Sequence, residues 1–116
     1  RLESVHNALE QAKTAALSIC GNDIAYDQAP WFWSDQYDVK LQTVGIRDKR
    51  VDVSIMRGDP AAKSFSVFYL VGDKICAVDS INAPADHMIS RRLIAARTSV
   101  DPNALADLSF DMKSLL

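Results

Sequence analysis

The chain has 116 residues, enough for one domain and short for two. Thirteen basic residues against fifteen acidic ones give a net charge of −2, which excludes a general polyanion binder with a wholly basic surface. We therefore expect no nucleic-acid partner, and no apolar run approaches the roughly 20 residues of a membrane span. Hydrophobic residues make up 48% of the chain and charged residues 24%, the composition of a globular domain with a core of its own.

Glycine and cysteine are both scarce. The four glycines stand at least thirteen residues apart, which excludes a Gly-rich dinucleotide loop or a P-loop within this chain. Cys20 and Cys76 are too few and too far apart for a disulfide scaffold or a thiolate metal site. We expect them to be reduced core thiols of a cytoplasmic protein. The start at Arg1, without Met or signal peptide, suggests a cut inside a longer protein.

The first predicted element is a helix between Ser4 and Gly21. Ser4 is a favoured N-cap, and Gly21 stands where a helix commonly ends on glycine. The apolar residues between them recur at helical spacing: Val5, Ala8, Leu9, Ala12, Ala16 and Ile19. Because this stripe is rich in alanine, we expect the helix to lie close against a flat partner.

A polar connector over residues 22–30 leads into an aromatic cluster. Four of the nine aromatic residues stand in the seven residues from Trp31 to Tyr37. In an extended stretch alternate residues face opposite ways, so Trp31 and Trp33 should share a side. Two interpretations are open: a tryptophan that anchors the sheet to another layer, or a wall against a flat ligand or a partner protein.

Four stretches after this cluster predict strands. Alternation or continuous apolar character marks residues 38–42, 51–56, 65–71 and 74–78. A charged turn at residues 47–50 precedes the second stretch, and Gly58-Asp59-Pro60 should end it. Because short connections join the strands, we expect them to be antiparallel.

The period returns to helical over residues 84–97, with Arg91 and Arg92 off the apolar face. The apolar positions expected to face the sheet are Met88, Ile89, Leu93 and Ala96. Asp101-Pro102 should start a short helix that carries Leu105 and Leu108. The order predicts an α+β fold: an antiparallel sheet of four to five strands, covered by C-terminal helices and preceded by one helix.

The residues contain no recognisable catalytic set. His6 and His87 are the only histidines, and neither has a cysteine or a carboxylate at metal-ligand spacing, so we expect no metal site. No nucleophile elbow or oxyanion motif is present, and no catalytic residue is identified.

Two segments nevertheless resemble signatures of a known family. They are RLESVHNALEQA at residues 1–12 and APWFWSDQY at residues 29–37, supported by FSVFYL at 65–70, AVD at 77–79 with Asn82 and Pro84, and RLI at 92–94. On these segments the chain resembles the FAD-dependent, NADH-using ferredoxin reductases. Members of this family feed electrons to [2Fe-2S] ferredoxins of cytochrome P450 and aromatic-ring dioxygenase systems.

The resemblance implies a division of the chain. Residues 1–21 would be the last helix of an FAD-binding domain, residues 22–30 a connector, and residues 31–116 the reductase C-terminal domain. The Rossmann domains that hold FAD and NADH would lie upstream. This part alone would then not be an enzyme, although the full-length parent would be an NADH:ferredoxin oxidoreductase.

The resemblance also implies two cofactor-binding groups. Ser4, Val5 and His6, at a helix N-terminus with free N–H groups and partial positive charge, would face the flavin pyrimidine edge and stabilise negative charge there. For Ser4, a plain N-cap role is compatible with this. Trp33, with Trp31, would lie beside the isoalloxazine, on the side where ferredoxin approaches.

Three cations are candidates for docking the acidic ferredoxin: Lys13, Arg91 and Arg92, with Lys113 as a further one. The other interpretation of Lys13 is a solvated helix lysine. The superfamily's CxxxxC pair and C-terminal His-Glu couple are missing, so we expect no disulfide chemistry.

Two broader interpretations remain open. The chain is either part of such a reductase or a stand-alone interaction and dimerisation module of the same fold without catalysis. Homologous domains of glutathione-reductase-like enzymes serve in dimerisation. The isolated chain would leave apolar surface uncovered, so we expect it to self-associate as a dimer.

Overall fold

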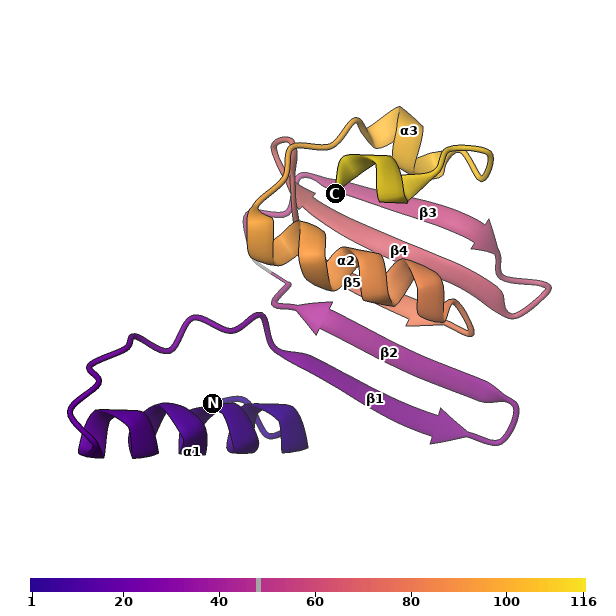
Figure 1. Ribbon diagram of the computed structural model, residues 1–116. Coiled ribbons are helices and arrows are strands. Elements are labelled where there is room, and N and C mark those ends of the chain that lie inside the picture. The colour runs from indigo at the N-terminus through magenta and orange to yellow at the C-terminus, as the bar shows by residue number, and fades with distance from the viewer. Residues whose placement is uncertain (48) are drawn as a thin grey trace.

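The computed structural model describes residues 1–47 and 49–116, so Asp48 of the predicted charged turn lies outside the described residues. Helices stand at both ends of the chain and strands between them (Figure 1). In chain order the elements are α1 (Val5–Ile19), β1 (Trp31–Gln36), β2 (Val39–Gly45), β3 (Val53–Asp59), β4 (Ser64–Val71), β5 (Lys74–Ile81), α2 (Pro84–Ala96), α3 (Pro102–Ala106) and the 3₁₀ helix η1 (Met112–Leu115).

The strands form one antiparallel sheet in the order β1-β2-β5-β4-β3. The predicted α+β fold is therefore confirmed, with five strands. The fifth strand is the aromatic segment itself: β1 is an edge strand in which Trp31 pairs with Val44 and Trp33 with Gln42. Although β2 and β3 are consecutive in the chain, β5 and β4 lie between them in the sheet.

The helices α2, α3 and η1 cover one face of the sheet, and the core lies under them (Figure 1). Phe68 and Leu70 of β4 are completely buried, as expected for a central apolar strand. The core combines side chains from the strands and from the C-terminal helices: Val44, Ile55, Phe68, Leu70, Ile75, Val78, Leu93, Val100, Leu105 and Met112.

The strand β3 differs from its prediction at both ends. It begins at Val53 rather than Val51, and it continues through Gly58 and Asp59, where we expected a break. Gly58 has a φ of 103°, and a Cβ there would stand 2.5 Å from the Ser64 carbonyl oxygen. Glycine thus lets the strand continue in a conformation that a side chain would block.

The buried face of α2 is rotated relative to the prediction. The helix has the expected bounds and a left-handed Arg97 cap, but Met88 is 65% exposed. His87 and Ser90 are buried together with Leu93 instead. Packing against the neighbouring strands, including β1, determines which side of the helix is buried. The pattern of apolar residues within the helix could not show this.

The expectation that one short helix carries both Leu105 and Leu108 is wrong for Leu108. The helix α3 ends at Ala106, and Leu108 is exposed. The reason is Arg57 of β3, whose buried guanidinium donates hydrogen bonds to successive carbonyl oxygens of this segment: those of Leu105, Asp107, Leu108 and Phe110. The carbonyl groups turn inward to meet Arg57, which also lies 3.6 Å from a carboxylate oxygen of Asp86.

The helix α1 forms as predicted but packs differently. The Ser4 hydroxyl caps it by accepting the Asn7 N–H, and Gly21 follows its end with a φ of 86°. The helix lies beside the edge strand β1 (Figure 1), and its apolar stripe stays exposed, Ile19 by 87%. The expected close packing against a flat partner is therefore not met within this chain.

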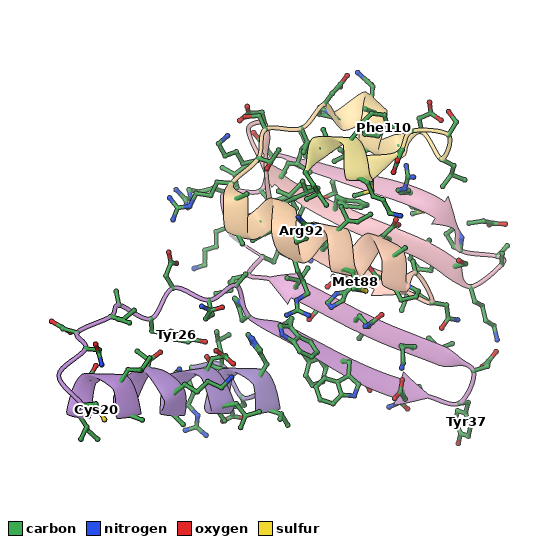
Figure 2. All side chains as sticks on the ribbon, viewed as in Figure 1. Cys20, Tyr26, Tyr37, Met88, Arg92 and Phe110 are labelled. Atoms are coloured by element: carbon green, nitrogen blue, oxygen red, sulfur yellow. The ribbon has the colours of Figure 1, made fainter. Side chains whose placement is uncertain are left out.

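The cysteine prediction is wrong for Cys20. This residue is exposed at the end of α1 (Figure 2), because the helix surface around it is uncovered. Cys76 is half-buried, and its thiol donates to the Tyr69 carbonyl oxygen at 3.3 Å.

Asn82 fixes the place where α2 begins. Its side-chain oxygen accepts the Lys40 N–H at 2.8 Å, and its amide donates to the carbonyl oxygens of Asp38 and Lys63, both at 3.0 Å. One side chain thus ties the β1–β2 turn and the β3–β4 turn to the junction between β5 and α2.

Candidate functional site

The two tryptophans stack on the same side of β1, as alternation predicted. Their ring centroids are 5.4 Å apart, and the ring planes meet at 31°. Trp33 is 40% exposed, whereas Trp31 is half-buried. Phe32 stands between them in the strand, and strand geometry directs it to the opposite face.

Trp31 is the point where α1, β1 and α2 meet. His6 of α1 lies against it with 5.1 Å between ring centroids, and His87 of α2 approaches edge-on at 6.0 Å. The Arg91 guanidinium stands over the Trp31 ring, 4.6 Å from its centroid, a cation–π distance. Trp31 therefore acts as the anchor between layers, and Trp33 is the ring that faces outward.

A pocket of about 500 Å³ opens beside these rings, between α1, β1 and α2. Its lining brings together five of the predicted site residues: Val5, His6, Trp31, Trp33 and Arg91. Leu9, Glu10 and Gln28 complete the lining. Ser4 lies in an adjoining pocket of about 140 Å³, which Trp31 also lines.

The N-terminus of α1 reaches this pocket with its polar groups partly unused. Ser4 takes the N–H of Asn7, and Tyr26 donates to the Asn7 side-chain oxygen at 2.8 Å. By helix geometry the N–H groups of Val5 and His6 stay outside the helical hydrogen bonds. Their partial positive charge lies at the rim of the pocket.

The surroundings of His6 favour the neutral form of its imidazole. Burial lowers the pKa of His6 from its ordinary value, and this outweighs the opposing attraction of Glu10. Arg91 and Lys13 lower the pKa further. A neutral ring can stack on Trp31 without bringing a second charge to the indole.

The predicted docking cations are spread over three elements. Lys13 is exposed on α1 and pairs with Glu10, which lowers the pKa of that carboxyl. Arg91 lines the pocket, but Arg92 does not. Arg92 instead lines a second pocket of about 530 Å³ with Lys113 of η1 and with Met88, which lies near it on α2 in Figure 2.

His87 is the residue of this cluster that sequence reasoning missed. The sequence offers it only as a metal ligand or as half of a His-Glu couple, yet it stands four residues before Arg91, and residues at that spacing share a side of a helix. That spacing was the signal that could have joined it to the candidate site.

The comparisons with known proteins agree on one family. A family model described as "Reductase C-terminal" matches residues 31–116. Putidaredoxin reductase of Pseudomonas putida is 46% identical over 100% of this chain, which corresponds to 27% of that relative. The ferredoxin–NAD(+) reductase component of the anthranilate 1,2-dioxygenase system of Burkholderia cepacia is 43% identical, again over 100% of this chain and 29% of the relative.

Solved structures give the same result. The ferredoxin reductase for the CYP199A2 system from Rhodopseudomonas palustris matches with a TM-score of 0.92 and 44% identity, over 98% of this chain and 28% of that one. The covalent putidaredoxin reductase–putidaredoxin complex matches with a TM-score of 0.91 and 46% identity, over 99% of this chain and 27% of the other.

The chain spans less than a third of the length of these relatives. Within the part of the chain that the structure describes, no helix is long and apolar enough to cross a membrane. The resemblance inferred from the two signature segments is confirmed by sequence and by fold: the chain belongs to the reductase C-terminal family, whose relatives here are ferredoxin reductases.

Proposed function

We propose that this chain is the C-terminal part of a flavoprotein that moves electrons from NADH through FAD to a [2Fe-2S] ferredoxin serving a cytochrome P450 or a dioxygenase. Its own share is to wall the flavin and to help dock the ferredoxin. The observation that carries the proposal is the outward-facing Trp33 at a pocket shared with the α1 N-terminus and Arg91. A bound FAD would supply the hydride and single-electron chemistry, and the residues of this chain would supply position and electrostatics.

The residues of the pocket fit one side of a flavin. The tryptophan rings offer a flat apolar wall, and the first turn of α1 offers N–H groups with partial positive charge. Nδ1 of His6 and Nε1 of Trp31 are buried and have no hydrogen-bond partner within the described ranges. These atoms can serve the polar edge of a ring system, with Ser4 and Val5 beside them.

The cations of α1 and α2 support ferredoxin docking. One of the matched structures is a covalent complex of putidaredoxin reductase with putidaredoxin. Arg91 is held at the pocket by its contact with Trp31, so its charge has a fixed position. Lys13 and Arg92 add positive charge around it, although Glu10 offsets part of the Lys13 charge.

The proposed division of the chain follows from the same observations. Residues 1–21 belong to the FAD-binding domain, residues 22–30 connect, and residues 31–116 form the C-terminal domain. The family match that begins at residue 31 supports this division. The exposed stripe of α1, which would pack in the FAD-binding domain, supports it as well. We place the protein in the cytoplasm, where the free and exposed thiol of Cys20 would stay reduced.

The test replaces Trp33 with alanine in the full-length flavoprotein that carries this chain. NADH-driven reduction of ferredoxin should fall about tenfold or more, because loss of the wall misplaces the electron-transfer partners. Reduction of ferricyanide, measured in parallel, reports whether the flavin itself still works. Tyr37→Ala is the matched control, since it removes an exposed aromatic side chain of the same segment at the β1–β2 turn, outside both pockets (Figure 2). Wild-type rates with both acceptors would refute the role of Trp33.

Docking is tested by Lys13→Glu and Arg91→Gln in the same flavoprotein. Each should weaken the apparent affinity for ferredoxin at low salt, and the difference should shrink at high salt because exposed charges are screened. Lys49→Glu makes the same charge change as Lys13→Glu at an exposed turn residue that does not line the pocket. Equal effects of Lys13→Glu and Lys49→Glu would show that net charge, and not docking at this site, is responsible.

A further inference from the structure

His87 occupies a position that the fold alone does not explain. Its side chain is 2% exposed, and neither ring nitrogen has a hydrogen-bond partner among the residues that the structure describes. A buried polar ring without such partners costs stability, and a hydrocarbon side chain would fill the space without that cost. The ring of His87 instead meets the ring of Trp31 edge-on, with 64° between the planes.

The charged groups around His87 oppose its protonation. Arg91, one turn further along α2, stands over the same Trp31 ring, and together with burial it lowers the pKa of His87. Asp86, the nearest carboxylate in the sequence, is paired with Arg57. Across Trp31 lies His6. Beyond these, Glu10 and Lys13 act on His6, Lys113 of η1 is exposed, and the buried residues of β2 and β5 under α2 are uncharged.

We propose that the neutral imidazole of His87 positions Trp31, and through it Trp33, and that protonation of His87 disrupts this tryptophan pair. An imidazolium here would place a second cation beside the Arg91 guanidinium at one indole, and the buried His87 ring would carry that charge without solvation. Either His87 or Arg91 must then leave the ring, and Trp31 loses one of the contacts that hold it. The connection to the flavin wall rests on the proposed function, whereas the positioning of the pair does not.

The direction of the pH effect follows from linkage. Because the pKa of His87 is lowered in the folded chain, the unfolded chain binds more protons below the ordinary histidine value of about 6.5. The stability and order that His87 contributes are therefore fully present at neutral pH. They are lost as the pH falls below about 6.5 toward the lowered value.

The composition of the chain makes a clean test feasible. It has two tryptophans, both in this cluster, and two histidines, so His6→Gln leaves His87 as the only imidazole. In this background, near-ultraviolet circular dichroism and tryptophan emission are followed from pH 8 to pH 5 with the 116-residue chain. We expect one transition below about pH 6.5. Adding His87→Phe, which keeps a ring but cannot titrate, should leave both signals constant over this range.

Arg91→Gln in the His6→Gln background provides a second, independent variant. Removal of the cation that opposes protonation should shift the transition to higher pH, which a purely structural role of Arg91 would not produce. Far-ultraviolet circular dichroism confirms that each variant is folded. The proposal is overturned if no transition occurs, if the His87→Phe variant retains it, or if its midpoint does not rise on loss of Arg91. No flavin or ferredoxin is present, so a failure here is distinct from a failure of the proposed function.

Discussion

Asn82 shows how much of the architecture can depend on one polar side chain. Its three hydrogen bonds reach two turns at the same end of the sheet, and its own φ of 48° is a left-handed conformation that asparagine tolerates. The residue was noted in the sequence only as part of a family segment.

We expect Asn82→Ala to lower the free energy of unfolding by about 1–3 kcal/mol, because carbonyl and N–H groups lose their partners and alanine is strained at this φ. Urea unfolding of the chain measures the change. Asn82→Gly separates the two causes, since glycine also loses the three hydrogen bonds but is not strained at this φ. Asn103→Ala on the exposed surface of α3 should change stability by less than about 0.5 kcal/mol. If Asn82→Ala is equally mild, the three hydrogen bonds do not stabilise the fold.

The two tryptophans show what a residue pattern can and cannot predict. Alternation placed Trp31 and Trp33 on the same side, because side chains of a strand alternate whatever surrounds it. It could not show that Trp31 is the anchor and Trp33 the exposed ring. That difference comes from His6 and Arg91, which reach Trp31 from helices far away in the sequence.

At the scale of elements, the C-terminal segment depends on β3. The guanidinium of Arg57 lies under the chain between α3 and η1 and holds its carbonyl groups. A lysine carries the same charge but cannot present several donors in a fixed plane.

We expect Arg57→Lys to raise amide hydrogen exchange in residues 105–116 while β4 and β5 keep their protection, because the lost bonds are local to that segment. Hydrogen-exchange mass spectrometry measures this. Lys74→Arg, an exposed change of the reverse kind on β5, is the control. Unchanged exchange in residues 105–116 would mean that core packing of Leu105 and Met112 alone holds the segment.

At the scale of the whole molecule, the apolar stripe of α1 stays exposed, although a self-contained fold would bury such a stripe. Val5, Leu9 and Ile19 all lie on a helix whose contact with the sheet runs through His6 and Trp31. Exposed apolar surface of this kind favours association. This stripe is also the observation that would favour a stand-alone interaction module.

We expect the isolated chain to form a dimer at high concentration, measured by light scattering after size-exclusion chromatography. Ile19→Lys should shift the equilibrium toward monomer without unfolding the chain, because Ile19 contributes almost nothing to the interior. Leu108→Lys, an exposed leucine far from α1, should leave the equilibrium unchanged. A monomer at every concentration would contradict the expected self-association.

Patterns among neighbouring residues predicted most of the helices and strands. The features that these patterns missed depend on tertiary packing. Caps and periodicity placed α1 and α2, and alternation placed the strands, because these depend on neighbouring residues. The order of strands, the side of α2 that is buried and the turn at Leu108 depend on contacts between distant segments. The candidate pocket was predicted in part, since five of its residues were named and His87 beside it was not.

Because Asn82 fixes where α2 begins, the number of residues between Asn82 and His87 determines where His87 and Arg91 lie. Asn82, two residues before α2, is hydrogen-bonded to the turn that follows β1. The start of α2 and the end of β1 are therefore held at a fixed distance from each other. A helix advances about 1.5 Å and turns about 100° per residue, whereas a strand advances about 3.3 Å. One residue inserted between Pro84 and His87 would swing His87 and Arg91 away from Trp31 and leave the sheet as it is. A substitution in this stretch can therefore leave the cluster in place, whereas an insertion or deletion would dismantle it.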